Sequence, residues 1–291
     1  MNIIISQIPI PIFRNTIQCL ESIKNDINIQ PLFWNHQHKP ALDMFDEVQP
    51  EIVFIHESQI DQAFLIACQQ FDFKYVLLSE NPLPQQLVKI PNAILTHPVF
   101  IDKFSSNENV INLQPMASIT EIHNAEYDED LACDILVNTT GVEFTNEITN
   151  ILLYLSNTYN VKIIGNNQVP LPQYLGQVNM VERANFIASC KVMIDFNQYD
   201  FWDASYLHIP SLSFYPTQPY TIAFNNIKTL KDSINSLLSN NLVHDRYVEE
   251  CYHHTTESHT CYHAAAQIFN TIKEPDIENR LLQYVKEITT I

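Results

Sequence analysis

The chain has 291 residues, 46% of them hydrophobic, and a formal net charge of −18. This length suits two domains of about 100–150 residues, each able to bury its own core. The acidity argues against a nucleic-acid partner, because binding to a phosphate backbone depends on clustered Lys and Arg.

The sequence carries no sign of a membrane or secretory protein. No apolar run approaches the ~20 residues of a membrane-spanning helix, and the start, MNIIIS, lacks the basic region of a signal peptide. We therefore expect a cytoplasmic protein without an integral membrane segment. None of the six cysteines forms a CxxC pair, so we expect reduced thiols.

Residues 1–100 alternate apolar runs with amphipathic segments, which predicts βαβ units in a parallel sheet. Pro40 is expected to begin a short helix that ends near Val48, and Ser58 to cap the next one. The apolar runs expected as strands lie at 2–6, 28–34, 51–56, 75–78 and 93–96.

Residues 102–131 interrupt this pattern with polar and acidic sequence, apart from one short strand at VINL. We interpret part of this stretch as an interdomain linker. The expected division is a Rossmann-like domain over 1–115, a linker over 116–131, a second domain over 132–272 and a final helix over 273–291 that packs back toward the first domain.

The second half is also predicted to alternate strands and helices. Asn179 and Glu182 have the spacing of a capping box, which marks the start of a helix. Two further helices are expected in the tail, interrupted by Pro275. The expected strands lie at 133–138, 161–165, 191–195 and 211–214.

Two carboxylates stand out in this half. Asp195 ends a predicted strand, and Asp203 opens a predicted helix eight residues later. Open α/β proteins bind ligands at the carboxyl ends of their strands, where such groups can accept bonds from ribose or sugar hydroxyls. The alternative is that Asp203 is an N-cap and Asp195 a turn residue. Asp200 and Arg183 are expected on solvated surfaces.

Gly141 is one of only three glycines, so the sequence contains neither a GxGxxG nor a Walker loop. It follows a predicted strand and precedes a helix that starts near Thr145. Its turn could offer backbone N–H groups to a diphosphate, with Thr140 adding a hydroxyl. The alternative is an ordinary turn between a strand and a helix.

Four segments over roughly 130–272 resemble the C-terminal domain of GT-B glycosyltransferases, most of all the spore-maturation-protein (CgeB-type) branch. Asp195 and Asp203 match the positions of the glutamates in the E-x7-E motif of retaining members. The matching segments are VKIIGNN, YLGQVNMVERANFIASCKVMID, DASYLHIPSLSF and SHTCYHAAAQI.

The resemblance implies an α/β, GT-B-like fold, with two Rossmann-type domains facing a central cleft. It further implies a glycosyltransferase that moves a sugar from a nucleotide-sugar to an unknown acceptor (a glycan, a protein or a small molecule), possibly with retention. No cofactor or metal is required. The residues it implies for donor binding are Asp195, Asp203, Gly141 and Thr140.

The sequence also departs from the family. His208 stands where the family has a helix glycine, and Ala264 replaces an arginine. The stretch NTTGVEFTNEITN lacks the Arg and Lys that the family places against the diphosphate. These departures leave open a catalytically degenerate GT-B-like binding or accessory protein. A third interpretation is an epimerase on the same fold.

The N-terminal domain is expected to supply the acceptor side and any catalytic base. The candidates follow predicted strands: His56 with Glu57, then Glu80, then His97. A histidine at a strand end is often structural instead. His259 and His263 have helical metal-ligand spacing, but the resemblance implies that they are packing residues of the fold. The aromatics Tyr199, Phe201, Trp202 and Tyr206 could stack on a base or sugar, or fill the site.

Overall fold

The computed structural model describes residues 1–6, 11–81, 89–96, 104, 109–112, 116–196, 200–214 and 220–290, without the side chains of 11–13. The chain divides into two compact units. Unit 1 comprises Met1–Gln114 and Cys261–Ile291, and unit 2 comprises Pro115–Thr260. All six cysteines are buried and free.

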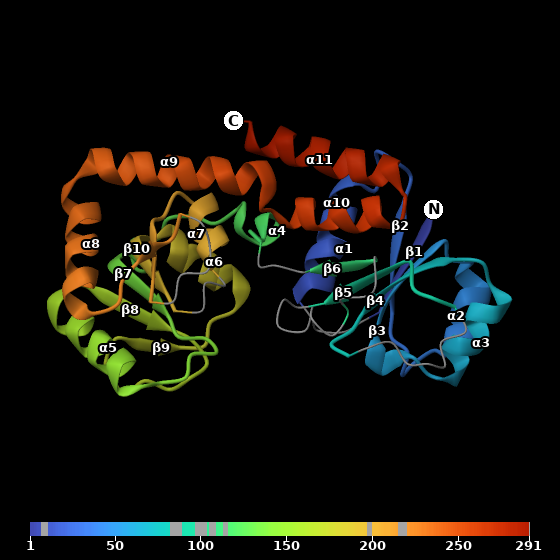
Figure 1. Cartoon of the computed structure of the whole chain (residues 1–291), viewed down its shortest axis with the longest axis horizontal. Helices are drawn as coiled ribbons and strands as arrows, with labels where there is room; N and C mark the ends of the chain where they lie inside the picture. Colours follow the sequence, from blue (N-terminus) through green and yellow to red (C-terminus); the bar gives the residue numbers. More distant parts are fainter. Residues whose placement is uncertain are drawn as a thin grey trace. The chain divides into compact units, whose positions relative to one another are not determined.

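Unit 1 is built on a parallel sheet of six strands in the order β2-β1-β3-β4-β5-β6 (Figure 1). Its inner strands are continuous apolar runs, as expected for strands covered on both faces. The strands are β1 (Asn2–Ser6), β2 (Gln30–Trp34), β3 (Ile52–His56), β4 (Lys74–Leu78), β5 (Ala93–Thr96) and β6 (Val110–Asn112).

Helices cover both faces of this sheet. On one face Phe45 of α2 and Phe64 of α3 pack with Val53 and Ile55 in an aromatic-rich core. The other face receives Phe269 of α10, whose ring contacts Phe54 with centroids 6.0 Å apart. The helices of unit 1 are α1 (Pro11–Ile23), α2 (Ala41–Val48), the 3-10 helix Glu57–Gln59, α3 (Gln62–Gln70), α10 (Cys261–Thr271) and α11 (Pro275–Thr289).

Unit 2 repeats the design with six parallel strands in the order β12-β11-β10-β7-β8-β9. The central strands β7 and β10 carry the buried runs ILVN and VMID, and their register aligns Asp195 with Asn138. The strands are β7 (Cys133–Asn138), β8 (Val161–Ile164), β9 (Tyr174–Gly176), β10 (Cys190–Asp195), β11 (Ser211–Ser213) and β12 (Ile222–Ala223).

Alternation along β7 and β10 directs side chains to two separate cores. Val137 and Ile194 face α5 and α8, whereas Leu136 and Met193 face α6 and α7 (Figure 1). The helices of unit 2 are α4 (Ile119–Ile122), α5 (Asn146–Thr158), α6 (Met180–Ala188), α7 (Phe201–Tyr206), α8 (Ile227–Ser239) and α9 (Asn241–Ser258).

Several sequence-based predictions need correction. Ser58 does not cap α3; Asp61 does, accepting the Phe64 amide at 2.8 Å, while Ser58 lies in the 3-10 helix. The 18-residue helix α9 was not predicted. Its sequence is mostly polar, and the buried side chains within it are Val248, Cys251 and Thr255, too few for a clear apolar stripe.

The expected domain boundaries differ from those of the compact units. The segment expected as a linker, 116–131, lies within unit 2 and contains α4, which contacts α6 and α7. Residues 261–272, expected in the second domain, belong to unit 1, where α10 contacts α1 and α11. In the described part of the chain no helix has the length and apolar character needed to cross a membrane.

Candidate functional site

The carboxyl edge of the unit 2 sheet gathers buried polar side chains. Asn138 ends β7 and Asp195 ends the neighbouring strand β10, and both are buried. Asp200 and Asp203 follow at the start of α7, and they are also buried. This is the edge at which open parallel sheets bind ligands.

Arg183 from α6 joins two of these carboxylates. An Asn179–Glu182 capping box fixes the start of α6, as predicted, and Arg183 follows one residue later. Its Nη2 donates to Asp203 Oδ2 at 2.7 Å, and its Nη1 pairs with Asp200 Oδ1. The two carboxylate side chains are 1–2% exposed, against 18% for the arginine. The predictions of solvated Arg183 and Asp200 are therefore wrong.

Hydrogen bonds extend this ion pair into a network. Asn138 Nδ2 donates to Asp200 Oδ2, which links β7 to the loop before α7. Asp195 Oδ2 accepts the Asp200 amide at 2.7 Å, and Asp203 Oδ1 accepts the Ser118 amide at 2.7 Å. The network thus connects both central strands, α6, α7 and the segment before α4. We call these residues the Arg183 network: Ser118, Asn138, Arg183, Asp195, Asp200 and Asp203.

The charges of the Arg183 network are unequal, with three carboxylates and one guanidinium. Burial raises the pKa of Asp203 to about 6, and the charge of Asp200 adds to this effect. The attraction of Arg183 and the Ser118 amide oppose the rise without cancelling it. Burial by itself lowers the pKa of Arg183, but Asp200 and Asp203 outweigh it and raise that pKa. The guanidinium is therefore permanently charged, whereas the pKa of Asp203 lies at about 6.

Asp203 is not the N-cap that the alternative interpretation required. Asp200 occupies the N-cap position of α7, and its side chain makes no capping bond there. Asp195 and Asp203 are only 2% and 1% exposed, with their acceptor atoms turned to groups of the protein itself. Both carboxylates therefore bind other segments of unit 2: Asp195 holds the residue before α7, and Asp203 holds the segment before α4.

Thr140 and Gly141 lie in the exposed turn between β7 and α5. Gly141 has a φ of 69°, in the left-handed region that glycine favours. The Thr140 amide donates to Asn138 Oδ1 at 2.9 Å, and the Gly141 amide donates to the exposed Asn166 at 3.1 Å. Thr145 is the N-cap of α5, so this helix starts where the sequence predicted. A ligand at this turn could take the place of the Asn166 amide oxygen.

His208 adopts the left-handed conformation that a glycine would favour, with a φ of 58°. This agrees with the resemblance, which assigns a glycine to this position. The His208 ring stacks on Tyr252, with centroids 4.2 Å apart. The aromatic residues before it are buried: Phe201, Trp202 and Tyr206 pack inside unit 2, and Tyr199 lies outside the described residues.

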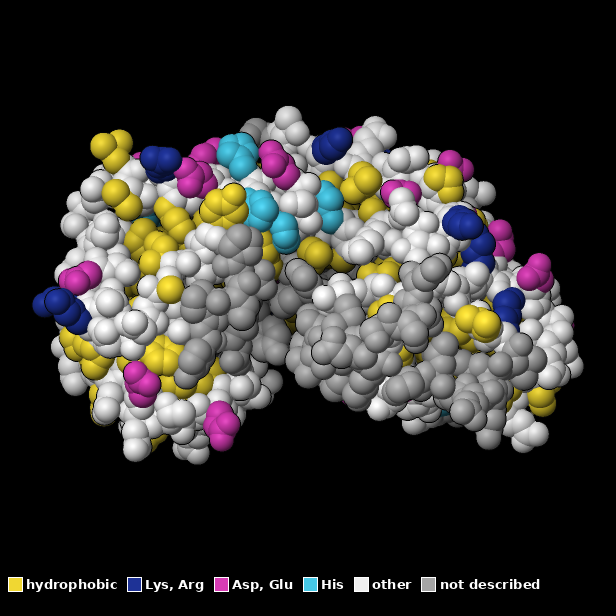
Figure 2. Space-filling model, in the orientation of Figure 1, with side chains coloured by type: hydrophobic (Ala, Val, Ile, Leu, Met, Phe, Trp, Pro, Cys, Tyr) yellow, Lys and Arg dark blue, Asp and Glu magenta, His cyan; other side chains and the backbone are white. Residues whose placement is uncertain are grey.

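Histidine side chains gather over the carboxyl half of α9 on the face drawn in Figure 2. The His259 ring stacks on Trp202, with centroids 4.1 Å apart, and also contacts His254. His259 follows α9 in unit 2, whereas His263 lies in α10 of unit 1, so no single helix carries the pair. Among the described residues no group of three or more potential metal ligands occurs.

In unit 1, His56 ends β3 and caps the 3-10 helix after it. Its Nδ1 accepts the Ser58 amide at 3.1 Å, so the neutral ring carries its proton on Nε2. In this tautomer Nε2 is a donor. The nitrogen that could accept a proton as a base is Nδ1, and it already accepts the Ser58 amide. Glu80 is exposed after β4, and His97 lies outside the described residues.

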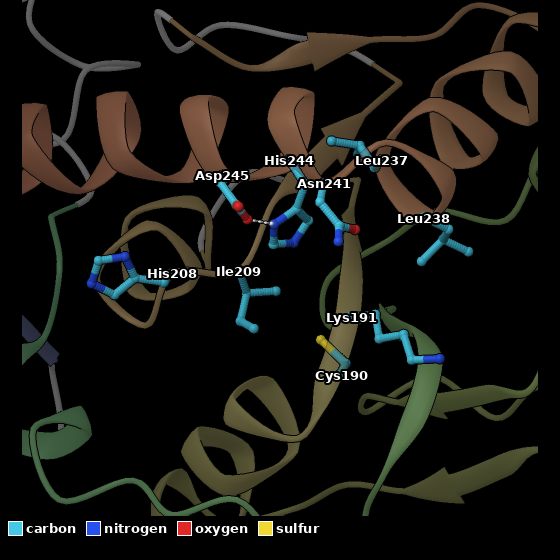
Figure 3. A pocket seen from close by; sticks show the side chains of 9 residues that line it. All are labelled: Cys190, Lys191, His208, Ile209, Leu237, Leu238, Asn241, His244 and Asp245. Atoms are coloured by element: carbon cyan, nitrogen blue, oxygen red, sulfur yellow. Dashed lines mark hydrogen bonds and ion pairs between the residues drawn. The ribbon is translucent and has the colours of Figure 1, made fainter.

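A pocket of about 450 Å³ opens at the opposite edge of the unit 2 sheet (Figure 3). Cys190 and Lys191, at the amino end of β10, form one side of it. His244 and Asp245 of α9 face it and contact each other at 3.2 Å. Because it lies away from the carboxyl ends of the strands, this pocket is separate from the Arg183 network.

No protein-family model and no curated protein matches the sequence. Solved structures match it over nearly the full length of both chains. A protein from Listeria monocytogenes assigned as a UDP-N-acetylglucosamine 2-epimerase has a TM-score of 0.59 and 11% identity, covering 95% of this chain and 97% of its own. A glycosyltransferase from Rickettsia africae has a TM-score of 0.58 and 10% identity, with 99% and 98% covered.

A UDP-GlcNAc 2-epimerase from Neisseria meningitidis, bound to UDP-GlcNAc, has a TM-score of 0.53 and 10% identity, with 94% and 100% covered. At such low identity these similarities establish the fold and nothing finer. Two units with parallel six-stranded sheets, matched over their whole length, give this chain the α/β GT-B-like fold.

Proposed function

We propose that the protein is a glycosyltransferase that moves a sugar from a nucleotide-sugar donor to an acceptor, within the GT-B type and closest in sequence pattern to its CgeB-type branch. The observation that carries the proposal is the full-length likeness to a glycosyltransferase and to an epimerase bound to a nucleotide-sugar. The D-x7-D spacing of Asp195 and Asp203 favours a retaining outcome.

In this proposal the turn between β7 and α5 receives the diphosphate of the donor. Thr140 and Gly141 are exposed there. When the Gly141 amide donates to a ligand, it loses only its hydrogen bond to the exposed Asn166 side chain. Backbone N–H groups beside a helix start favour anionic groups, which suits a region that lacks Lys and Arg.

Asp195 and Asp203 serve the donor site through the Arg183 network. Their carboxylates are buried, so we assign them the task of holding the end of β10, Asp200 and the start of α7 in place. A positioning role predicts that Asp203→Asn, which retains one acceptor oxygen for the Ser118 amide, keeps more donor affinity than Asp203→Ala.

The test is calorimetric titration of the intact chain with UDP, GDP, ADP and their common sugar conjugates, followed by an assay of donor hydrolysis. We expect one nucleotide family to bind, and Gly141→Pro, which removes the amide and cannot adopt the φ of 69° of this turn, to weaken it. Failure of every nucleotide to bind folded protein would refute the proposal. Binding without turnover toward any acceptor would instead point to the catalytically degenerate alternative.

A second candidate is a nucleotide-sugar epimerase, favoured by the similarity to two proteins of that description. Proton NMR of the nucleotide-sugar alone separates the two activities. An epimerase changes the sugar and leaves the diphosphate linkage intact without any acceptor, whereas a transferase, with water as the acceptor, releases the nucleotide and the free sugar.

A further inference from the structure

The pocket of about 450 Å³ at the amino edge of the unit 2 sheet has no part in the proposed function (Figure 3). We call it the α9 pocket, because the first turns of α9 form one of its walls. Its other walls come from the start of β10, the turn that follows α7 and the end of α8. All four segments belong to unit 2. A volume of this size is typical of sites for small molecules.

One side of the α9 pocket is apolar. Leu237 and Leu238 come from the last turn of α8, and Ile209 comes from the turn after α7. Cys190 adds its thiol, which donates to the Ile187 carbonyl at 3.3 Å and behaves otherwise as a small apolar group. A ligand with an apolar body can therefore remove that body from water against this side.

The side formed by α9 carries hydrogen-bond acceptors. His244 Nδ1 contacts Asp245 Oδ1 at 3.2 Å, and Nδ1 is the donor because a carboxylate only accepts. In the neutral ring Nε2 is then an acceptor, and Figure 3 shows this ring and the Asn241 amide directed from α9 into the pocket. The Asp245 side chain is 74% exposed, so its carboxylate can accept a second donor from a ligand.

The charges around the α9 pocket favour a cation. The Lys191 ammonium is engaged elsewhere: it donates to Asp134 Oδ1 at 2.7 Å, and in Figure 3 its side chain runs away from His244 and Asp245. Burial lowers the pKa of His208, so this imidazole is neutral at pH 7. The Asp245 carboxylate therefore sets the sign of the local charge, and the net charge of −18 adds a long-range attraction for cations.

We propose that the α9 pocket binds a small organic amine, a ligand with an apolar body and a protonated amino group. The apolar body lies against Leu237, Leu238 and Ile209. The ammonium donates charge-assisted hydrogen bonds to the Asp245 carboxylate and to His244 Nε2. An anion of the same shape meets the Asp245 carboxylate and is repelled by it. This proposal concerns a second site and does not depend on the proposed function.

Three probes of one shape test the charge preference: benzylamine, benzyl alcohol and benzoate, titrated into the isotope-labelled full chain at about pH 8, where alkylammonium groups are charged. The amide NMR signals of Asn241, His244 and Lys191 report binding at the pocket. We expect benzylamine to bind about fivefold more tightly than benzyl alcohol, as for a solvent-accessible ion pair, and benzoate to bind most weakly. Because salt screens exposed charges, about 500 mM NaCl should bring the amine-to-alcohol ratio close to one.

Two variants separate the contributions of charge and apolar contact. Asp245→Asn should abolish the preference for benzylamine over benzyl alcohol and leave the affinity for the alcohol nearly unchanged. Its control is Asp232→Asn, which removes an equal charge from an exposed position of α8 outside the pocket. Leu238→Ala should weaken all three probes alike, by about threefold. Its control is Leu242→Ala, which truncates an exposed side chain of α9 that does not line the pocket.

Several results would overturn the proposal. One is that benzoate binds as tightly as benzylamine, and another is that the probes shift amide signals elsewhere and not those of the pocket. A preference for benzylamine that survives Asp245→Asn, or failure of all three probes to bind the folded chain, has the same consequence. Titration of the same samples with UDP tests the proposed function separately, because the pocket lies away from the Arg183 network.

Discussion

The two units present the same kind of sheet edge but use it differently. In unit 2 the Arg183 network pairs its buried carboxylates with a guanidinium, an amide side chain and backbone amides. In unit 1 the Thr96 hydroxyl and Asn112 Oδ1, at the ends of β5 and β6, have no partners among the described residues. Arg183 Nε and the Ser213 hydroxyl in unit 2 are also buried without partners. The two edges therefore differ in charge: the carboxylates buried in the Arg183 network have partners, whereas the groups left without partners at the unit 1 edge are neutral.

The physical basis is the cost of burying charge. A buried ion pair adds little net stability compared with apolar packing, but removing one partner is strongly destabilising because the other charge stays buried. A lone neutral hydroxyl costs less to bury than a charge. Changes at the two edges should therefore affect stability to very different degrees.

The largest effect is expected from Arg183→Met. It leaves the Asp200 and Asp203 carboxylates buried without their cation, and we expect a loss of about 3–5 kcal/mol in the free energy of unfolding. Urea unfolding measures it. The control is Arg246→Met, which breaks an exposed pair with Glu250 and should leave the free energy of unfolding nearly unchanged. Equal losses of stability in Arg183→Met and Arg246→Met would mean that the buried ion pairs of the Arg183 network matter no more to stability than an exposed pair.

Gly165→Ala should follow, at about 2–3 kcal/mol. Gly165 has a φ of 145°, and an added Cβ would lie 2.3 Å from Thr139 Oγ1 and 2.9 Å from backbone atoms of the β7–α5 turn. Gly176→Ala is the control, since a Cβ there meets nothing within 4 Å, although its φ of 92° is strained. Thermal unfolding of both variants should rank Gly165→Ala as the less stable protein.

Asp203→Ala should cost about 1–3 kcal/mol, because it strands the buried Ser118 amide and weakens the pairing of Arg183. Asp203→Asn keeps one acceptor oxygen and should cost less. Urea unfolding of the two variants side by side gives the difference. A larger loss for Asn than for Ala would contradict the role assigned to the Ser118 bond.

The same residue predicts a pH dependence. Its folded-state pKa of about 6 exceeds the unfolded value of 3.8, so the folded protein binds the proton more tightly. The stability that this proton contributes is complete below about pH 4 and is lost as the pH rises through 6. Unfolding measured between pH 4.5 and 7.5 should show stability falling with pH more in the wild type than in Asp203→Asn. Parallel pH profiles would refute the shifted pKa.

The smallest effect is expected from Thr96→Val. It removes a buried hydroxyl that has no partner and nearly preserves the side-chain shape, so we expect a change between zero and a gain of about 1 kcal/mol. Thermal unfolding without ligand measures it. A loss above about 1 kcal/mol would mean that the hydroxyl already has a structural partner, and the contrast between the two edges would weaken.

The sequence predicted the architecture because parallel strands buried on both faces must be continuous apolar runs. The runs at 2–6, 51–56 and 133–138 became β1, β3 and β7 within a residue at either end. The capping box predicted at Asn179 and Glu182 is also present, because it depends only on residues within the first turn of the helix. The polar helix α9 was missed because its stability comes from packing by a few residues, which leaves little periodicity.

The chemistry of the site depended on contacts between distant segments. Nothing in the local sequence distinguishes Arg183 from a surface residue, yet it is the one Lys or Arg between 163 and 190, and the fold brings Asp200 and Asp203 to it. Likewise, nothing local marks Thr96 and Asn112 as neighbours; the strand order and register do.

By itself, then, the sequence determined two α/β units and the ends of most strands, because propensity, capping and apolar periodicity act over a few residues. The tertiary structure alone decided which polar groups are paired and which are left without partners. Pairing depends on atoms brought within about 3 Å by chain segments that lie far apart in sequence.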